Sequence, residues 1–114
     1  MNVKFLTTLD VRDIDNHFWM LLAPFVVEVD GRLVYVPAGF TTDFASVPRL
    51  PLTFMLFGNI GHRAAVVHDY LCSLKTCTYQ EAAKAFEACM REEKVSWWRR
   101  WAMTKAVLWF GPRF

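Results

Sequence analysis

Residues 36–49, VPAGFTTDFASVPR, lie where a strand-rich first half of the chain meets a helix-rich second half. Within this stretch Gly39 permits a positive φ angle, which most other residues adopt only with strain. Pro37 and Pro48 fix their own φ angles and bias the residues before them towards extended conformations. The stretch therefore predicts an ordered loop, and ordered loops on a rigid scaffold often carry functional residues.

A second polar motif lies further along the chain, inside an apolar helical run. Residues 64–71 read AAVVHDYL, so His68 and Asp69 stand next to each other between apolar neighbours. We expect this pair to meet Asp43 of the loop in space. The loop and the pair together are the candidate functional site.

Composition and charge limit the fold and the partners. Of the 114 residues, 54% are hydrophobic and 16% are aromatic, which is enough for one core. The chain is short for two domains of usual size, so we expect a single domain, residues 1–114. Residues 1–60 carry four basic and six acidic side chains, whereas residues 61–114 carry nine and five. This mildly basic second half falls short of a nucleic-acid footprint, so no nucleic acid is expected as a partner.

The sequence also bears on location and on the state of the cysteines. No apolar run approaches the roughly eighteen residues that span a bilayer, because Lys, Arg, Asp or Glu interrupts each one. The first residues lack the apolar stretch and cleavage site of a signal peptide, so we expect a cytoplasmic protein. Cys72, Cys77 and Cys89 lack metal-ligand spacing and are expected to be buried thiols, with a Cys72–Cys77 disulfide as the alternative.

The first half of the chain predicts a small, mostly antiparallel sheet. Residues 3–9 and 17–22 are apolar enough for strands, and the acidic, polar residues 10–16 between them are expected to form a surface turn. Residues 25–29 and 32–36 flank an Asp-Gly pair, which is the strongest short-range signal for a β-hairpin.

The second half predicts about three helices packed on that sheet, which gives an α+β fold. Residues 62–74 have the apolar spacing of a helix. Thr78 and Glu81 have the spacing of a capping box at the start of a second helix. Ser96 is expected to cap a third helix, which a Gly-Pro pair ends.

The two motifs resemble the signature of a small phage and prophage family catalogued as domain of unknown function 1353. They occur here as residues 36–49 and 64–71, and Ala82 to Phe86 fits an Ala-x-x-x-Phe pattern in the helices of that family. The resemblance spans nearly the whole chain. It implies a phage protein in the host cytoplasm, one that can be incorporated into the virion, with a virion, tail or host protein as its partner. It supplies no established activity.

The helix around His68 is also similar to the catalytic helix of secreted and parvoviral phospholipases of type A-two. In those enzymes the His deprotonates a water molecule and the adjacent Asp binds calcium. The similarity implies that His68 is a general base and Asp69 a calcium ligand, with the loop up to Asp43 supplying further oxygen ligands. The acidic residue that orients the His in those enzymes would fall at Ala83, so Asp43 is the candidate for that role.

A structural role for the same residues is the leading alternative to catalysis. His68 and Asp43 can form a buried polar pair that pins the loop to the helix. Arg49 is a candidate counter-ion of Asp43 or Asp69, and it belongs with Ser46 to the candidate binding residues. Ser46 lacks the context of a nucleophile elbow, so a Ser-His-Asp hydrolase is not expected. The sequence thus favours a non-enzymatic binding module over a small calcium-assisted hydrolase of a lipid or cell-envelope ester or amide.

The predicted third helix supplies a separate candidate surface. Its tryptophans stand among basic residues: Trp97, Trp98, Arg99, Arg100, Trp101, Lys105, Trp109 and Arg113. Two or three of the rings could close the core under snorkelling arginines. Tryptophan and arginine also dominate protein–protein hot spots, which makes this helix a candidate docking surface. Contact with a membrane surface is the third possibility.

Overall fold

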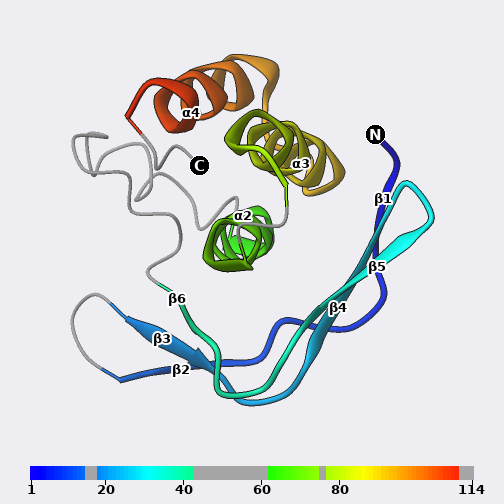
Figure 1. Ribbon diagram of the computed structural model, residues 1–114, viewed down its shortest axis with the longest axis vertical. Coiled ribbons are helices and arrows are strands. Elements are labelled where there is room, and N and C mark those ends of the chain that lie inside the picture. Colours follow the sequence, from blue (N-terminus) through cyan, green and yellow to red (C-terminus); the bar gives the residue numbers. More distant parts are fainter. Residues whose placement is uncertain (15–17, 43–61, 75–76, 111–114) are drawn as a thin grey trace.

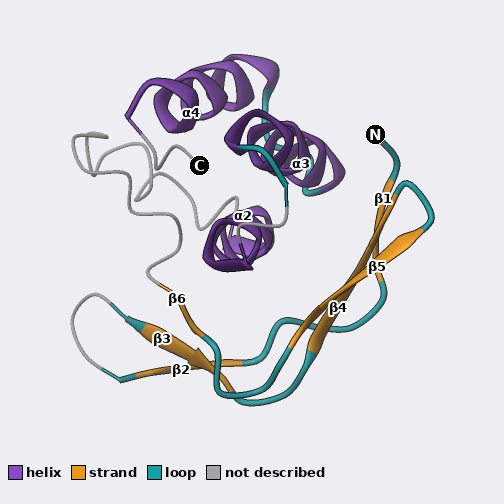
Figure 2. Cartoon of the chain, in the orientation of Figure 1, coloured by secondary structure: helices purple, strands orange, loops and turns teal. Residues whose placement is uncertain are grey.

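Short antiparallel strands precede a layer of helices in the chain, which confirms the predicted α+β fold (Figures 1 and 2). The computed structural model describes residues 1–14, 18–42, 62–74 and 77–110. The described strands are β1 (Val3–Phe5), β2 (Val11–Asp13), β3 (Trp19–Leu21), β4 (Phe25–Val29), β5 (Arg32–Val36) and β6 (Thr41–Thr42). The described helices are α2 (His62–Leu74), α3 (Tyr79–Glu92) and α4 (Trp97–Phe110).

The first sheet contains the predicted hairpin and has the strand order β1-β4-β5. Asp30 and Gly31 have φ angles of 50° and 79°, which fit the type I′ turn that an Asp-Gly pair favours. The turn makes Val29 and Arg32 partners in the antiparallel register. Asn2 holds β1 against the turn, because its N–H donates to Asp30 Oδ1 at 2.7 Å and its carbonyl accepts from Asp30 N at 2.8 Å.

The remaining strands form a second antiparallel sheet with the order β2-β3-β6, so the expectation of a single sheet was wrong. The expectation of a surface turn over residues 10–16 was also wrong where the structure describes it, because β2 pairs Val11 with Leu21 of β3. Whether such a short segment forms a strand depends more on pairing with a neighbouring strand than on its own composition. Gly39 has the predicted positive φ, 88°, and its N–H donates to Leu21 O at 2.8 Å, which brings the chain alongside β3.

The helices begin close to their predicted positions. The capping box is confirmed: Glu81 N–H donates to Thr78 Oγ1 and Thr78 N–H donates to Glu81 Oε1, both at 3.1 Å. Ser96 stands before α4 as predicted, and its carbonyl accepts from Arg100 N. Its hydroxyl is buried without a hydrogen-bond partner among the described residues, so the predicted side-chain cap was wrong.

The core lies between the sheets and the helices. In Figure 1, α3 lies between α2 and α4, and α2 faces both sheets. Apolar side chains from β3, β4 and β5 meet apolar side chains of α2 and α3: Leu21, Phe25, Val27, Val36, Val66, Val67, Phe86, Cys89 and Met90. Among the described residues, no helix is both long and apolar enough to cross a membrane.

Candidate functional site

His68 lies in the interior, on the face of α2 that packs against α3. Its ring centroid is 5.1 Å from that of Phe86, and only 5% of the residue is exposed. Cys72 lies one turn further along α2, and its Sγ is 3.6 Å from His68 Nε2. The imidazole is therefore enclosed by a thiol and an aromatic ring.

Asp69 connects α2 to the loop that the sequence singled out. The hydroxyl of Thr42 donates a hydrogen bond to Asp69 Oδ2 at 2.5 Å. Thr42 is buried, and β6 pairs it with Trp19 of β3. Asp69 Oδ1 lies 4.0 Å from His68 Nδ1, so the carboxylate stands between the strand and the imidazole. The first part of the loop thus meets the His-Asp pair.

Sequence reasoning missed the role of Thr42. The sequence offers only the position of Thr42 directly before Asp43, and it does not show which of the adjacent Thr41 and Thr42 points inward; the structure exposes Thr41 and buries Thr42. Asp43, Ser46 and Arg49 lie outside the described residues, so their predicted places beside His68 stay predictions.

An aromatic contact supports the same junction of loop and helix. The rings of Phe40 and Tyr70 meet edge to face, with their centroids 5.4 Å apart and their planes at 89°. Aromatic pairs favour this geometry because the edge of one ring is positive and the face of the other is negative. Residues on either side of the Thr42–Asp69 bond therefore pack together, and the segment before residue 43 is anchored on α2.

The thiol beside His68 is held in its neutral form. Burial, followed by the charges of Asp69 and Cys77, raises the pKa of Cys72 to about 11. Burial likewise raises the pKa of Cys89 to about 12. All three cysteines are free; Cys89 is buried as expected, whereas Cys72 and Cys77 are half-buried. A neutral thiol is a poor nucleophile, so Cys72 acts as a packing group and a weak hydrogen-bond partner.

The predicted calcium site receives one described residue, Asp69. In the described part of the chain, no three His, Cys, Asp or Glu side chains lie close enough together to hold a metal ion. On α3, Ala83 is buried and Glu81 is engaged in the capping box, so neither takes the place of the acidic residue that orients a catalytic His. Calcium binding by Asp69 and Asp43 stays a prediction.

The tryptophans of α4 point away from the core. The exposed fractions are 72% for Trp97, 46% for Trp98, 60% for Trp101 and 61% for Trp109. The buried side of the helix is formed by Met103, Ala106 and Val107. The expectation that two or three of these rings close the core was wrong, because Met103, Ala106 and Val107 form the side of α4 that packs inward. We call Trp97, Trp98, Trp101 and Trp109 the tryptophan face.

Two arginines of α4 are held in different ways. Arg100 Nε donates to Glu87 Oε1 of α3 at 3.2 Å, which links α4 to α3, and its Nη1 donates to Val95 O of the connection between the two helices at 2.7 Å. The guanidinium of Arg99 stacks 5.0 Å from the ring centroid of Trp98. Next to these contacts is an open hollow of about 280 Å³, lined by Glu87, Trp97, Arg100, Trp101, Thr104 and Lys105.

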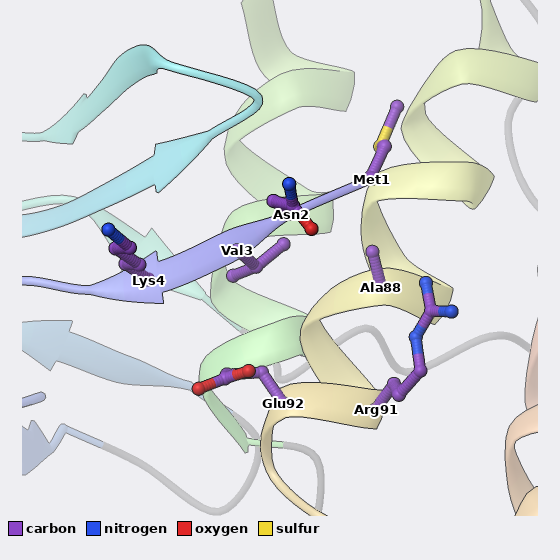
Figure 3. Close-up of a pocket in the computed structure, with 7 residues that line it drawn as sticks. All are labelled: Met1, Asn2, Val3, Lys4, Ala88, Arg91 and Glu92. Carbon is purple, nitrogen blue, oxygen red and sulfur yellow. The ribbon is translucent and has the colours of Figure 1, made fainter.

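A larger hollow lies between β1 and α3, and the sequence did not point to it. It measures about 490 Å³ and is lined by the first four residues together with Ala88, Arg91 and Glu92 (Figure 3). Figure 3 shows Val3 and Ala88 facing each other across it, with the charged side chains of α3 at the rim. Arg91 is already paired with Glu87 at 3.4 Å. The hollow is therefore an open groove with mixed charges.

Comparison with known proteins identifies relatives of this chain. Residues 19–107 match the model of a family described as "Protein of unknown function (DUF1353)". The "Uncharacterized protein y4jT" of Sinorhizobium fredii (strain NBRC 101917 / NGR234) is 34% identical over 79 residues, which cover 68% of this chain and 24% of that protein. The chain thus spans about a quarter of the length of this relative. No solved structure matches. The phage association and the phospholipase similarity stay predictions.

Proposed function

This chain belongs to the DUF1353 family of proteins of unknown function, and we propose that it acts as a protein-binding module that docks through the tryptophan face of α4. The observation that carries the proposal is the exposure of four indole rings on the outer side of one helix. A helix that is apolar on its outer side as well as its inner side is usually covered on both.

The area of the tryptophan face fits a protein interface. A fully exposed indole side chain offers up to about 250 Å², so the observed exposures leave roughly 600 Å² of tryptophan surface available. A standard interface buries about 800 Å² on each partner, and tryptophan is the residue most enriched at its energetic centre. The tryptophan face therefore supplies most of one side of such an interface.

The positive charge around α4 indicates that the partner carries negative charge. Residues 94–114 contain five basic residues and no acidic residue. Arg99 and Lys105 lie among the exposed rings and offer positive charge at the rim. The partner we propose is a protein with an apolar docking surface and an acidic rim, and the phage resemblance would make it a virion, tail or host protein.

A calcium-assisted hydrolase with His68 as general base is the second candidate. The hydrogen bond between Thr42 and Asp69 favours it, because that bond brings the loop beside the His-Asp pair. We place it second because His68 is 5% exposed and its ring is packed against Phe86 and Cys72. A general base must reach the proton that it removes.

The test compares wild type with Trp97→Ser/Trp101→Ser and with Leu22→Ser, a matched change at an exposed apolar residue outside α4. Proteins retained from a lysate of the source cells by the immobilised chain are identified, purified and titrated against each variant. Loss of two of the four exposed tryptophans should weaken binding at least about 100-fold, and Leu22→Ser should leave it unchanged. Higher salt should also weaken binding, because the rim is charged.

Two results would contradict the proposal. The first is a partner that binds the double variant as tightly as wild type. The second is binding to vesicles rich in phosphatidylserine, abolished by the double variant, with no purified protein bound; that result would assign the tryptophan face to a membrane surface.

A further inference from the structure

The outer edge of β5 has the geometry of a self-pairing strand, and we infer that two copies of this chain associate through it into one continuous antiparallel sheet. β5 is at the edge of its sheet, since β4 pairs it on one side only among the described strands. This association is separate from the tryptophan face, which lies on α4.

The hairpin register fixes which backbone groups of β5 are free. In a two-residue type I′ hairpin the residues flanking the turn, Val29 and Arg32, exchange both hydrogen bonds, and alternate pairs after them do the same. Val27 and Val34 form the next hydrogen-bonded pair. The N–H and C=O groups of Leu33 and Tyr35 therefore point away from β4, towards the open edge.

The pairing of β4 with β1 supports this assignment. Val26 has its backbone directed to β1, because Val26 O accepts from Leu6 N at 3.0 Å. Val26 is the partner of Tyr35 in the β4–β5 register, so this pair is not hydrogen-bonded within the hairpin. The same alternation directs the backbone N–H and C=O of Tyr35 to the outer side of β5.

The side chains at the open edge are apolar and exposed. Leu33 is 66% exposed and Tyr35 is 54% exposed. Open edges in natural proteins are usually blocked by lysine, proline, a bulge or an inward-pointing charge. In β5 the only charged residue is Arg32, at the start of the strand, so the interior of the edge has no such block.

The strand best suited to pair with the open edge of β5 is β5 of a second copy, related by a two-fold axis. With a two-fold axis through Val34, Leu33 of one copy lies opposite Tyr35 of the other, and each such pair can exchange two backbone hydrogen bonds. The same arrangement places a leucine against a tyrosine twice on one face of the joined sheet, a favourable cross-strand pair. The free groups on each edge are therefore complementary to themselves.

The positions of Arg32, Pro37 and the turn favour this register over the two registers shifted to either side. The two Arg32 side chains lie at opposite ends of the paired strands, roughly 14 Å apart along the strand direction, so they do not repel each other closely. A shift that centres the axis on Tyr35 would place Pro37 opposite Leu33, and proline has no N–H to donate. A shift that centres it on Leu33 would leave Tyr35 opposite Gly31 of the turn.

The short edge predicts a weak dimer. Five residues on each side bury less than a standard interface, so association is expected only at high protein concentration. Sedimentation velocity of the full chain between about 10 μM and 1 mM should show the average mass rising towards that of a dimer. Hydrogen exchange followed by NMR should show new protection of the Leu33 and Tyr35 amides at the higher concentration, with no change at Val34.

Leu33→Lys/Tyr35→Lys tests the edge, and Leu22→Lys is the matched control. Because these side chains are exposed, each variant should keep the wild-type circular dichroism and thermal midpoint. The edge variant should weaken dimerisation at least tenfold, and the control should leave it unchanged. Trp97→Ser/Trp101→Ser should dimerise like wild type, which separates this inference from the proposed function.

Three outcomes would overturn the inference. A monomeric mass at 1 mM would do so, as would association without protection of the Leu33 and Tyr35 amides. Association abolished by Trp97→Ser/Trp101→Ser and retained in the edge variant would show that copies meet through the tryptophan face instead.

Discussion

Glu93 provides a test of how the helices are held together, because it caps a helix to which it does not belong. It follows the last residue of α3, and its Oε1 accepts a hydrogen bond from Ala64 N–H at 2.8 Å. Its Oε2 accepts a longer bond, 3.4 Å, from Arg63 N–H, and the Arg63 guanidinium lies 3.8 Å away. A carboxylate at the start of α2 satisfies donors that the helix itself leaves unpaired.

Removal of this carboxylate should destabilise the fold by about 2 kcal/mol. In Glu93→Ala the buried N–H of Ala64 loses its acceptor, which costs about 1–3 kcal/mol, and the longer bond to Arg63 adds little. Glu93→Gln keeps a carbonyl acceptor, so its cost should stay near 1 kcal/mol or below. Urea unfolding followed by circular dichroism measures both variants at pH 7. Equal stability of Glu93→Ala and wild type would refute the capping role.

The pH dependence of the Gln variant tests the electrostatics. Burial raises the pKa of Glu93 above its ordinary value near 4.5, against the lowering effect of the two backbone bonds and Arg63. Between the two pKa values the folded chain holds a proton that the unfolded chain has released, so wild-type stability falls as pH rises through this window. Gln does not titrate. The stability of Glu93→Gln relative to wild type should therefore increase as pH rises above the ordinary pKa near 4.5 and level off once the folded carboxyl is ionised. A decrease would show that the cap and Arg63 outweigh burial.

Two further predictions concern the His-Asp region. Thr42→Val keeps the shape of the side chain but removes the hydroxyl that Asp69 accepts from, so the free energy of unfolding in urea should fall by about 1–3 kcal/mol; an unchanged value would show that Asp69 finds another donor. Under the binding proposal, the thermal midpoint should be the same in millimolar calcium and in chelator. A rise equivalent to about 2.7 kcal/mol at a hundredfold excess over the dissociation constant, abolished in Asp69→Asn, would instead favour the hydrolase.

Signals that act within a few residues could be read from the sequence. The Asp-Gly turn fixes both φ angles and the register of β4 and β5, and the box formed by Thr78 and Glu81 fixes the start of α3. The helix over residues 62–74 follows from its apolar spacing. Each of these features depends on neighbours in the chain, so no knowledge of the tertiary structure was needed.

Features that depend on distant contacts could not be read in this way. β2 is polar, and it is a strand because β3 lies beside it. Thr42 meets Asp69 across 27 residues, and the carboxylate of Glu93 reaches α2 across 29. The direction of the tryptophans was equally hidden, because α4 is apolar on several sides and its own period does not show which side packs against α3.

The tryptophan face is exposed and the His68–Asp69 pair is largely buried, so the first is suited to binding and the second to stabilising the fold. α4 is held to α3 by its buried side, Met103, Ala106 and Val107, and by the contact between Arg100 and Glu87, so this packing does not need the exposed rings of Trp97 and Trp101. Exposed indoles contribute little to folding and favour unwanted association, so their presence needs a cause outside the fold. His68 and Asp69 contribute to the fold itself. The ring of His68 packs against Phe86 of α3, and Asp69 accepts the hydrogen bond from Thr42 that links α2 to β6. Since α3 lies between the two regions, changes to the exposed tryptophans Trp97 and Trp101 should alter binding with little effect on stability, and changes at Thr42 should do the reverse (Figure 1).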